Sequence, residues 1–182
     1  MSNVYPVFWK SEDTKALLDW WQILPKKGAW CAELRRAQTP ADVLLCQGFR
    51  YLCYDLAGFW TSESNILGLA AVAGIISHLK INNGTTFATA CATPPAGKSK
   101  APVSELRFAQ LQKSRTLDEF FARMVRMTHL LGEAADPVSV ANDTLQWFTE
   151  SVKAETASDP RKSILVRWGF DYFQHLPRET SK

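Results

Sequence analysis

The chain has 182 residues, of which 46% are hydrophobic and 21% are charged. That length suits one ordinary domain or two small ones, and the composition excludes a disordered tail. The formal net charge of +3 is too small to identify a partner, so any charged surface has to come from local clusters. The N-terminus shows no export signal and the longest apolar run, residues 66–76, is too short for a bilayer. We therefore expect a cytoplasmic protein without a membrane span.

The N-terminal half reads as a series of helices. Ser11 is a candidate cap for a first helix that Pro25 ends, and a shorter helix follows around Trp30. Thr39 followed by Pro40 is a strong start signal for a further helix that extends to Leu56, with a possible break near Gly48. Residues 64–80 are apolar around most of the circumference of a helix, which predicts a position at the centre of a bundle.

Residues 82–102 are rich in Thr, Ala, Gly and Pro and predict a linker. Helix resumes at Ser104, and Thr116 with Glu119 forms a capping box before the next helix. Asp136 and Asp159, each followed by proline, predict two more helix starts. The sequence thus predicts an all-α fold of two bundles, residues 1–84 and 103–182, joined by a loop at 85–102. Residues 85–91 alone show a weak strand-like alternation.

The stretch ATPPAGKS at residues 92–99 resembles a phosphate-binding loop. A working loop presents backbone N–H groups to the phosphates between a strand and a helix. Pro94 and Pro95 remove two donors, and Pro102 interrupts the helix that has to follow. A nucleotide-binding enzyme that uses Lys98 is therefore a minor alternative, and we expect Lys98 and Lys100 to be mobile charges on the loop.

Charge is distributed unevenly along the second half. Residues 98–126 contain seven basic residues against three acidic ones, and residues 130–159 contain six acidic residues against Lys153. We expect one positive and one negative face, and the opposite charges suggest self-association of copies. Arg123 and Arg126 share one side of a helix, and Arg35 and Arg36 form a second pair. Guanidinium groups match phosphate geometry with two donors at once, so these clusters favour nucleic-acid binding.

No catalytic or metal-binding constellation is apparent. The four cysteines lack C-x-x-C spacing, and we expect reduced, mostly buried thiols. The histidines at 78, 129 and 175 each lie next to leucine, which favours core or boundary packing. We expect no metal, no cofactor and no small-molecule substrate. All seven tryptophans are assigned to the core by default.

Three blocks together resemble a known family: CAELRRAQTPADVLLCQGFRYL, VSELRFAQLQKSRTLDEFFARMVRMTHLL and RWGFDYF. They are similar to the CasB family, the small subunit of Cascade, the RNA-guided complex of type I-E CRISPR systems. The resemblance spans residues from about Trp20 to about Phe173. It implies an all-α, non-enzymatic subunit that lies head to tail with its copies, contacts other Cascade subunits, crRNA, and target and displaced DNA, and stabilises the R-loop.

The resemblance assigns phosphate contacts to basic residues that coincide with the family's basic positions: Arg35, Arg36, Arg107, Lys113, Arg115 and Arg123. Arg50, in the matching helix, is added, and Arg126 is inferred from its neighbour Arg123. Such contacts read no bases, so we expect binding that does not depend on sequence. A protein-interaction adaptor without nucleic-acid binding is the main alternative.

Overall fold

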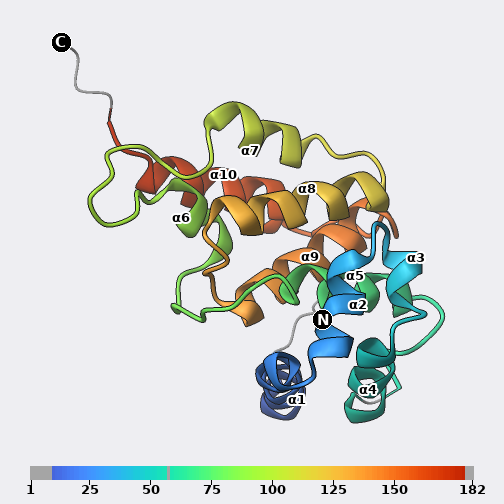
Figure 1. Ribbon diagram of the computed structural model, residues 1–182. Helices are drawn as coiled ribbons and strands as arrows, with labels where there is room; N and C mark the ends of the chain where they lie inside the picture. The colour runs from blue at the N-terminus through green and yellow to red at the C-terminus, as the bar shows by residue number, and fades with distance from the viewer. Residues whose placement is uncertain (1–9, 57, 179–182) are drawn as a thin grey trace.

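A computed structural model describes residues 10–56 and 58–178 as a layered set of helices (Figure 1). Within these residues the only β pairing is an isolated bridge between Ile81 and Ala134, so the predicted all-α class is confirmed. In chain order the elements are α1 (Ser11–Ile23), the 3-10 helix η1 (Leu24–Lys26), α2 (Gly28–Arg36), α3 (Pro40–Val43), α4 (Gln47–Asp55), α5 (Ile66–Ile76), α6 (Phe87–Ala92), α7 (Glu105–Gln112), α8 (Leu117–Leu130), α9 (Pro137–Ser151), the 3-10 helix η2 (Pro160–Lys162) and α10 (Ile164–His175).

Local capping interactions set several helix starts where the sequence predicts them. The backbone N–H of Asp42 donates to Thr39 Oγ1 at 3.2 Å, and Thr39 N donates to Asp42 Oδ2 at 2.9 Å. This reciprocal box spans Pro40, the first residue of α3. Asp136 Oδ1 accepts from Val138 N at 2.9 Å at the start of α9. The predicted starts at Thr39 and Asp136 are therefore confirmed.

One prediction about the N-terminal helices is wrong, and one possible break is observed. Ser11 does not cap α1: Lys10 holds the cap position and makes no side-chain capping bond. The helix expected from Thr39 to Leu56 is divided between Val43 and Gln47, close to the break that the sequence allows near Gly48, because Cys46 is extended (ψ 136°). Glu33 Oε2 then accepts a hydrogen bond from Gln47 N at 3.0 Å, so a side chain of α2 satisfies the first turn of α4.

In the second half of the chain, the structure differs from the sequence prediction at two places. The expected linker contains α6, a short helix whose Phe87 and Cys91 are fully buried. It packs against α10, and burial there stabilises a helix of six residues that is too short to be stable alone. The start predicted at Asp159 gives only η2, and α10 begins after Ser163, whose Oγ accepts from Val166 N at 3.4 Å.

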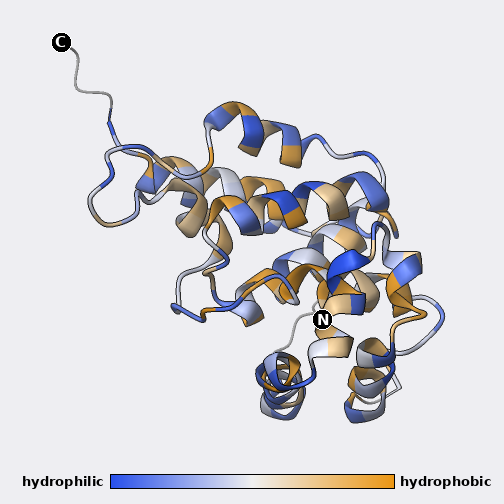
Figure 2. Cartoon of the chain, viewed as in Figure 1, coloured by the Kyte–Doolittle hydropathy of each residue, from blue (hydrophilic) through white to orange (hydrophobic). Residues whose placement is uncertain are grey.

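Helix α5 lies at the centre of the fold, as its sequence predicts. All residues from Gly68 to Ile76 are buried, and α5 packs against α3, α8 and α9. One continuous buried cluster extends from Leu17 to Tyr172 and includes residues of both halves. Around this core the helices in Figure 2 carry hydrophobic and hydrophilic residues on different sides. The division into bundles at 84 and 103 stays a prediction.

Backbone hydrogen bonds also connect the halves. Lys80 N and Ile81 N donate to the carbonyl oxygen of Glu133 at 2.8 and 3.2 Å, and Ala135 N donates back to the carbonyl oxygen of Ile81 at 3.1 Å. Glu133 has a positive φ of 62° in the tight turn between α8 and α9. None of the described helices is long and apolar enough to cross a bilayer.

Candidate nucleic-acid interface

Five of the eight predicted basic residues lie on α7, α8 and the turn between them, and four of the five are free of ion pairs in the part of the chain that the structure describes. The two helices run antiparallel and adjacent in Figure 1, joined by residues 113–116. Arg107, Lys113, Arg115 and Arg126 are exposed, and within the described residues none of them forms an ion pair. We call these four residues the α7–α8 basic edge. Their charges are available to an anionic partner.

Arg123, which the sequence groups with Arg126, has a different environment. Its Nη1 donates to the carbonyl oxygen of Gln110 at 2.5 Å and to Ser114 Oγ at 3.0 Å, and its Nη2 forms an ion pair with Glu119. The side chain is 27% exposed. Arg123 therefore ties the end of α7 to the first turns of α8. Its donors are occupied internally, which leaves it poorly placed to hold a phosphate.

The two arginines at the end of α2, Arg35 and Arg36, also differ in their environments. Arg35 is half-buried, and its Nε donates to the carbonyl oxygen of Ser77 at 2.8 Å, which satisfies the C-terminal end of α5. Arg36 is exposed, but it lies beside a shallow pocket that Glu33 and Asp42 also line. These two carboxylates reduce the positive potential around Arg36. Neither arginine has the unopposed charge of the α7–α8 basic edge.

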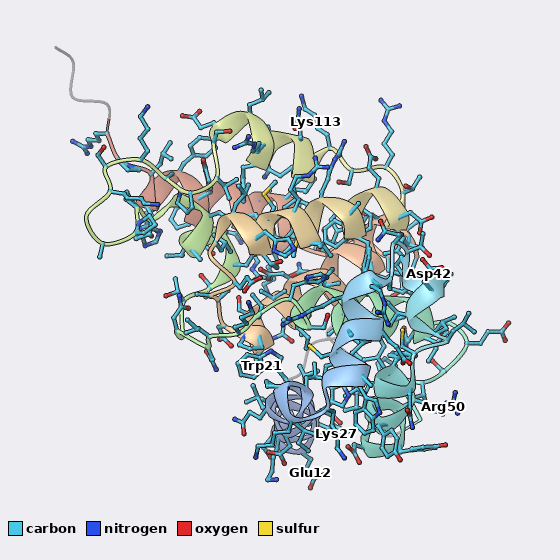
Figure 3. All side chains as sticks on the ribbon, in the orientation of Figure 1. Glu12, Trp21, Lys27, Asp42, Arg50 and Lys113 are labelled. Atoms are coloured by element: carbon cyan, nitrogen blue, oxygen red, sulfur yellow. The ribbon has the colours of Figure 1, made fainter. Side chains whose placement is uncertain are left out.

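Arg50 is exposed on α4 and lies far from that edge. Figure 3 shows Arg50 at the lower side of the molecule and Lys113 at the opposite side, at the end of α7. Because separation in a projection is a lower bound on true separation, the eight residues do not form one compact patch. Arg107, Lys113, Arg115 and Arg126 lie on two consecutive helices and the turn that joins them, whereas Arg50 lies on α4.

The acidic block at residues 130–159 is mostly engaged in internal contacts. Glu133 pairs with Lys80 and with His129, and Glu150 accepts from Ile164 N at 3.1 Å. Asp143 is 4% exposed and accepts from Trp168 Nε1 at 2.8 Å, and burial raises its pKa to about 6. The remaining carboxylates cap or pair locally: Asp136, Glu155 and Asp159. Ion pairs with nearby cations weaken the expected negative face, because they involve four of the six acidic residues: Glu133, Asp143, Glu155 and Asp159.

The predicted packing role is confirmed for His78 and for the mostly buried thiols, but it is wrong for His129 and His175, which are exposed. His78 is 5% exposed, and its pKa is lowered to about 4, first by burial and then by the charges of His129 and Arg35. His175 is exposed, with Nδ1 2.8 Å from the carbonyl oxygen of Asp171. All four cysteines are free thiols, and Cys53 alone is more than marginally exposed. Burial raises the pKa of the Cys91 thiol well above its usual range, so it is an inert core group.

The loop that resembles a phosphate site has the wrong surroundings. Helix α6 precedes it where a strand is needed, and α7 begins only at Glu105. Lys98 N donates to the carbonyl oxygen of Pro95 at 2.9 Å, so one candidate donor already closes a turn. Lys98 and Lys100 are exposed, in agreement with the expectation that they are loop charges.

Sequence reasoning missed a row of aromatic rings between α2 and α4. The rings of Trp30 and Tyr51 stack with centroids 4.3 Å apart and planes at 26°, and Tyr54 meets Tyr51 edge to face at 6.0 Å. Tyr51 is 45% exposed and Tyr54 is 74% exposed. We call Trp30, Tyr51 and Tyr54 the aromatic ladder. The available signal was the spacing of the two tyrosines, three residues apart on one helix face beside Arg50.

The other described tryptophans are buried or half-buried, as the expectation of core packing requires. Trp20, Trp60, Trp147 and Trp168 are buried, and Trp21 is half-buried with its Nε1 donating to the carbonyl oxygen of Leu79 at 3.2 Å. Trp9 lies outside the described residues. Trp30 therefore differs from the other described tryptophans in forming part of an exposed aromatic surface.

One of three comparisons with known proteins found a match, and this match agrees with the resemblance. The family described as CRISPR-associated protein Cse2 matches residues 30–173, which is most of the chain. A comparison with curated proteins and one with solved structures each found no match. The matched range includes the α7–α8 basic edge and the aromatic ladder. The chain belongs to the CRISPR-associated Cse2 family, also called CasB, and is a subunit of type I-E Cascade.

Proposed function

We propose that this chain is a non-catalytic, nucleic-acid-binding subunit of Cascade. It helps to hold crRNA and target or displaced DNA, and it stabilises the R-loop through phosphate contacts that do not depend on sequence. The α7–α8 basic edge is the observation that supports this function. Its four cationic side chains are exposed and outside the ion pairs of the described residues. The proposed location is the cytoplasm, where a guide-RNA complex meets invading DNA.

Counterion release gives the expected strength of this binding. Each arginine or lysine that neutralises a phosphate releases condensed cations, and the logarithm of affinity falls with the logarithm of salt concentration by about 0.7 per contact on single strands. Four contacts give a slope of roughly 3. Phosphate contacts fix position without reading bases, so guide-target pairing selects the sequence.

The test compares two double variants of the full chain. Arg115→Ala with Arg126→Ala removes two charges from the α7–α8 basic edge, and Lys10→Ala with Lys15→Ala removes two exposed charges from the start of α1. Binding of a fluorescent single-stranded oligonucleotide is measured by anisotropy over a range of KCl concentrations. The edge variant should bind more weakly, with a slope reduced by about 1.4, whereas the control should retain the wild-type slope. Equal behaviour of the two variants at low salt would reject the edge as a contact site.

An adaptor role through protein contacts is the second candidate. Helix α10 exposes Val166 (49%), Phe170 (67%) and Phe173 (60%) along one face, at spacings of four and three residues. An apolar helix face suits a contact with another Cascade subunit. Head-to-tail self-association also stays a prediction, and the internal pairing of the acidic block gives it little electrostatic support. If the chain enters Cascade but binds no oligonucleotide at low salt, the adaptor role replaces the first proposal.

A further inference from the structure

We propose that the aromatic ladder is a stacking site for unpaired bases of single-stranded nucleic acid. This inference rests on the proposed function and extends it, because it assigns a second contact of a different chemical kind. The α7–α8 basic edge offers charge to any phosphate backbone. The ladder offers ring faces, which only an unpaired strand can use, since the bases of a duplex are already stacked on one another.

The first support is that the inner ring of the ladder is fixed while the outer ring is open to solvent. Helices α2 and α4 are in close contact at Gly48, where an added Cβ would lie 3.0 Å from Trp30 Cβ. Trp20 Nε1 also donates to the carbonyl oxygen of Gly48 at 2.8 Å, which anchors α4 from a second side. The inner ring, Trp30, is therefore held by the fold. The outer ring, Tyr54, is 74% exposed, so a planar group can approach it without displacing protein.

The second support is the charge around the rings. Lys27 Nζ lies 5.3 Å from the centre of the Trp30 ring, and Arg50 is adjacent in sequence to Tyr51 and one helical turn from Tyr54. Figure 3 places Lys27 and Arg50 together in the lower part of the molecule, on α2's start and on α4. Residues 24–36 and 47–55 contain five basic residues and two acidic ones. One of the two acids, Glu33, is engaged at the start of α4, and one of the five cations, Arg35, is engaged with the carbonyl oxygen of Ser77.

This combination favours nucleic acid over a protein partner. Single-strand-binding surfaces combine aromatic faces for successive bases with cations for the intervening phosphates. Along the ladder, Lys27 lies 5.3 Å from the centre of the Trp30 ring. On α10, by contrast, the cation beside Val166 and Phe170 is Arg167, which is already bound to Gln146 and Asp143. Every base has a π face, so stacking here does not select sequence. That property agrees with a subunit that leaves sequence selection to the guide.

The experiment measures binding of the full chain to a fluorescent oligo(dT) strand and to a duplex of equal length. Tyr54→Ala removes the outer ring, and Tyr51→Ala with Tyr54→Ala removes both rings of α4. Tyr54→Phe keeps the ring without the hydroxyl, and Phe170→Ala removes an exposed ring elsewhere. Loss of one stacked base should weaken single-strand binding about tenfold. Duplex binding should stay unchanged, and the Tyr54→Phe and Phe170→Ala variants should bind as the wild type does. Far-UV circular dichroism checks the helical content of each variant.

The outcomes separate this inference from the proposed function. If Tyr54→Ala binds oligo(dT) as the wild type does while Arg115→Ala with Arg126→Ala binds weakly, the ladder is refuted and the edge remains. If the reverse holds, the edge is refuted and the ladder remains. An equal loss of single-strand and duplex binding in Tyr54→Ala also overturns stacking. Reduced entry of Tyr54→Ala into Cascade with unchanged oligo(dT) binding assigns the ladder to a protein partner and overturns the inference.

Discussion

Gly74 is a point of closest approach between α5 and its neighbours, and replacing it with alanine should destabilise the protein. A Cβ atom at this position would lie 2.6 Å from Phe121 Cε2, 2.7 Å from Phe121 Cζ and 3.0 Å from Val43 Cγ2. Favourable carbon contacts lie at about 3.5–4.0 Å. Phe121 is 1% exposed and Val43 is fully buried, so neither side chain can move into solvent to make room.

Two opposing effects set the magnitude. Overpacking a buried site costs about 1–3 kcal/mol, while alanine is favoured over glycine in a helix by about 1 kcal/mol. Because the contacts at Gly74 involve an immobile ring, we expect the clash to dominate and the free energy of unfolding to fall by about 1–2 kcal/mol. For a chain of this size the Tm should fall by roughly 2–8 °C. Thermal and urea unfolding followed by circular dichroism measure both quantities.

Gly169→Ala is the matched control. Gly169 lies inside α10, and the nearest atom to an added Cβ is Gln112 Nε2 at 3.9 Å, an ordinary contact distance. Here the helix propensity acts alone, and the variant should be stabilised by up to about 1 kcal/mol. Replacement of glycine by alanine should thus lower the stability at position 74 and raise it at position 169. If Gly74→Ala raised the Tm as Gly169→Ala does, the close packing around α5 described here would be wrong.

The remaining predictions concern stability. Arg123→Ala should lower the free energy of unfolding by about 1–2 kcal/mol, because it removes hydrogen bonds between α7 and α8, whereas Arg126→Ala should change it by less than about 0.5 kcal/mol in the same urea titration. The pKa of Asp143 is raised to about 6, so its contribution to stability is full below pH 3.8 and is lost as the pH rises through 6. The pKa of His78 is lowered to about 4, so its contribution is full above pH 6.5 and is lost as the pH falls towards 4. These two contributions, roughly 3 kcal/mol each, oppose each other between pH 6 and 4. The Asp143→Asn variant should therefore lose stability on acidification more steeply than the wild type. Parallel curves of unfolding free energy against pH for the two proteins would contradict the assignment.

The sequence predicts helices well where local chemistry decides them. Thr39 with Asp42 and Asp136 before Pro137 act over three residues, and all of their partners are visible in the sequence. Helix α6 was missed because its stability comes from burying Phe87 and Cys91 against α10, a contact between segments far apart in the chain. Tertiary burial of that kind leaves no periodic signal in six residues.

The site was predicted less well for the same reason. Arg123 and Arg126 are equivalent on a helical wheel, yet Arg123 meets Gln110 and Ser114 because the preceding turn folds back on α8. Arg35 meets Ser77, 42 residues away. Whether a basic residue faces solvent or an internal acceptor depends on such distant contacts. The resemblance gave the family correctly, but it could not distinguish cations that are free from those already engaged.

The central position of α5 has a consequence for the order in which this chain acquires its shape. During synthesis α5 leaves the ribosome well before α8 and α9, the two long helices that cover it. Until those later segments emerge, the apolar surface of α5 can be buried only against the helices that precede it in the chain. Maturation of the fold is therefore a late event, and the nascent N-terminal half is the stage at which this protein most needs protection from aggregation.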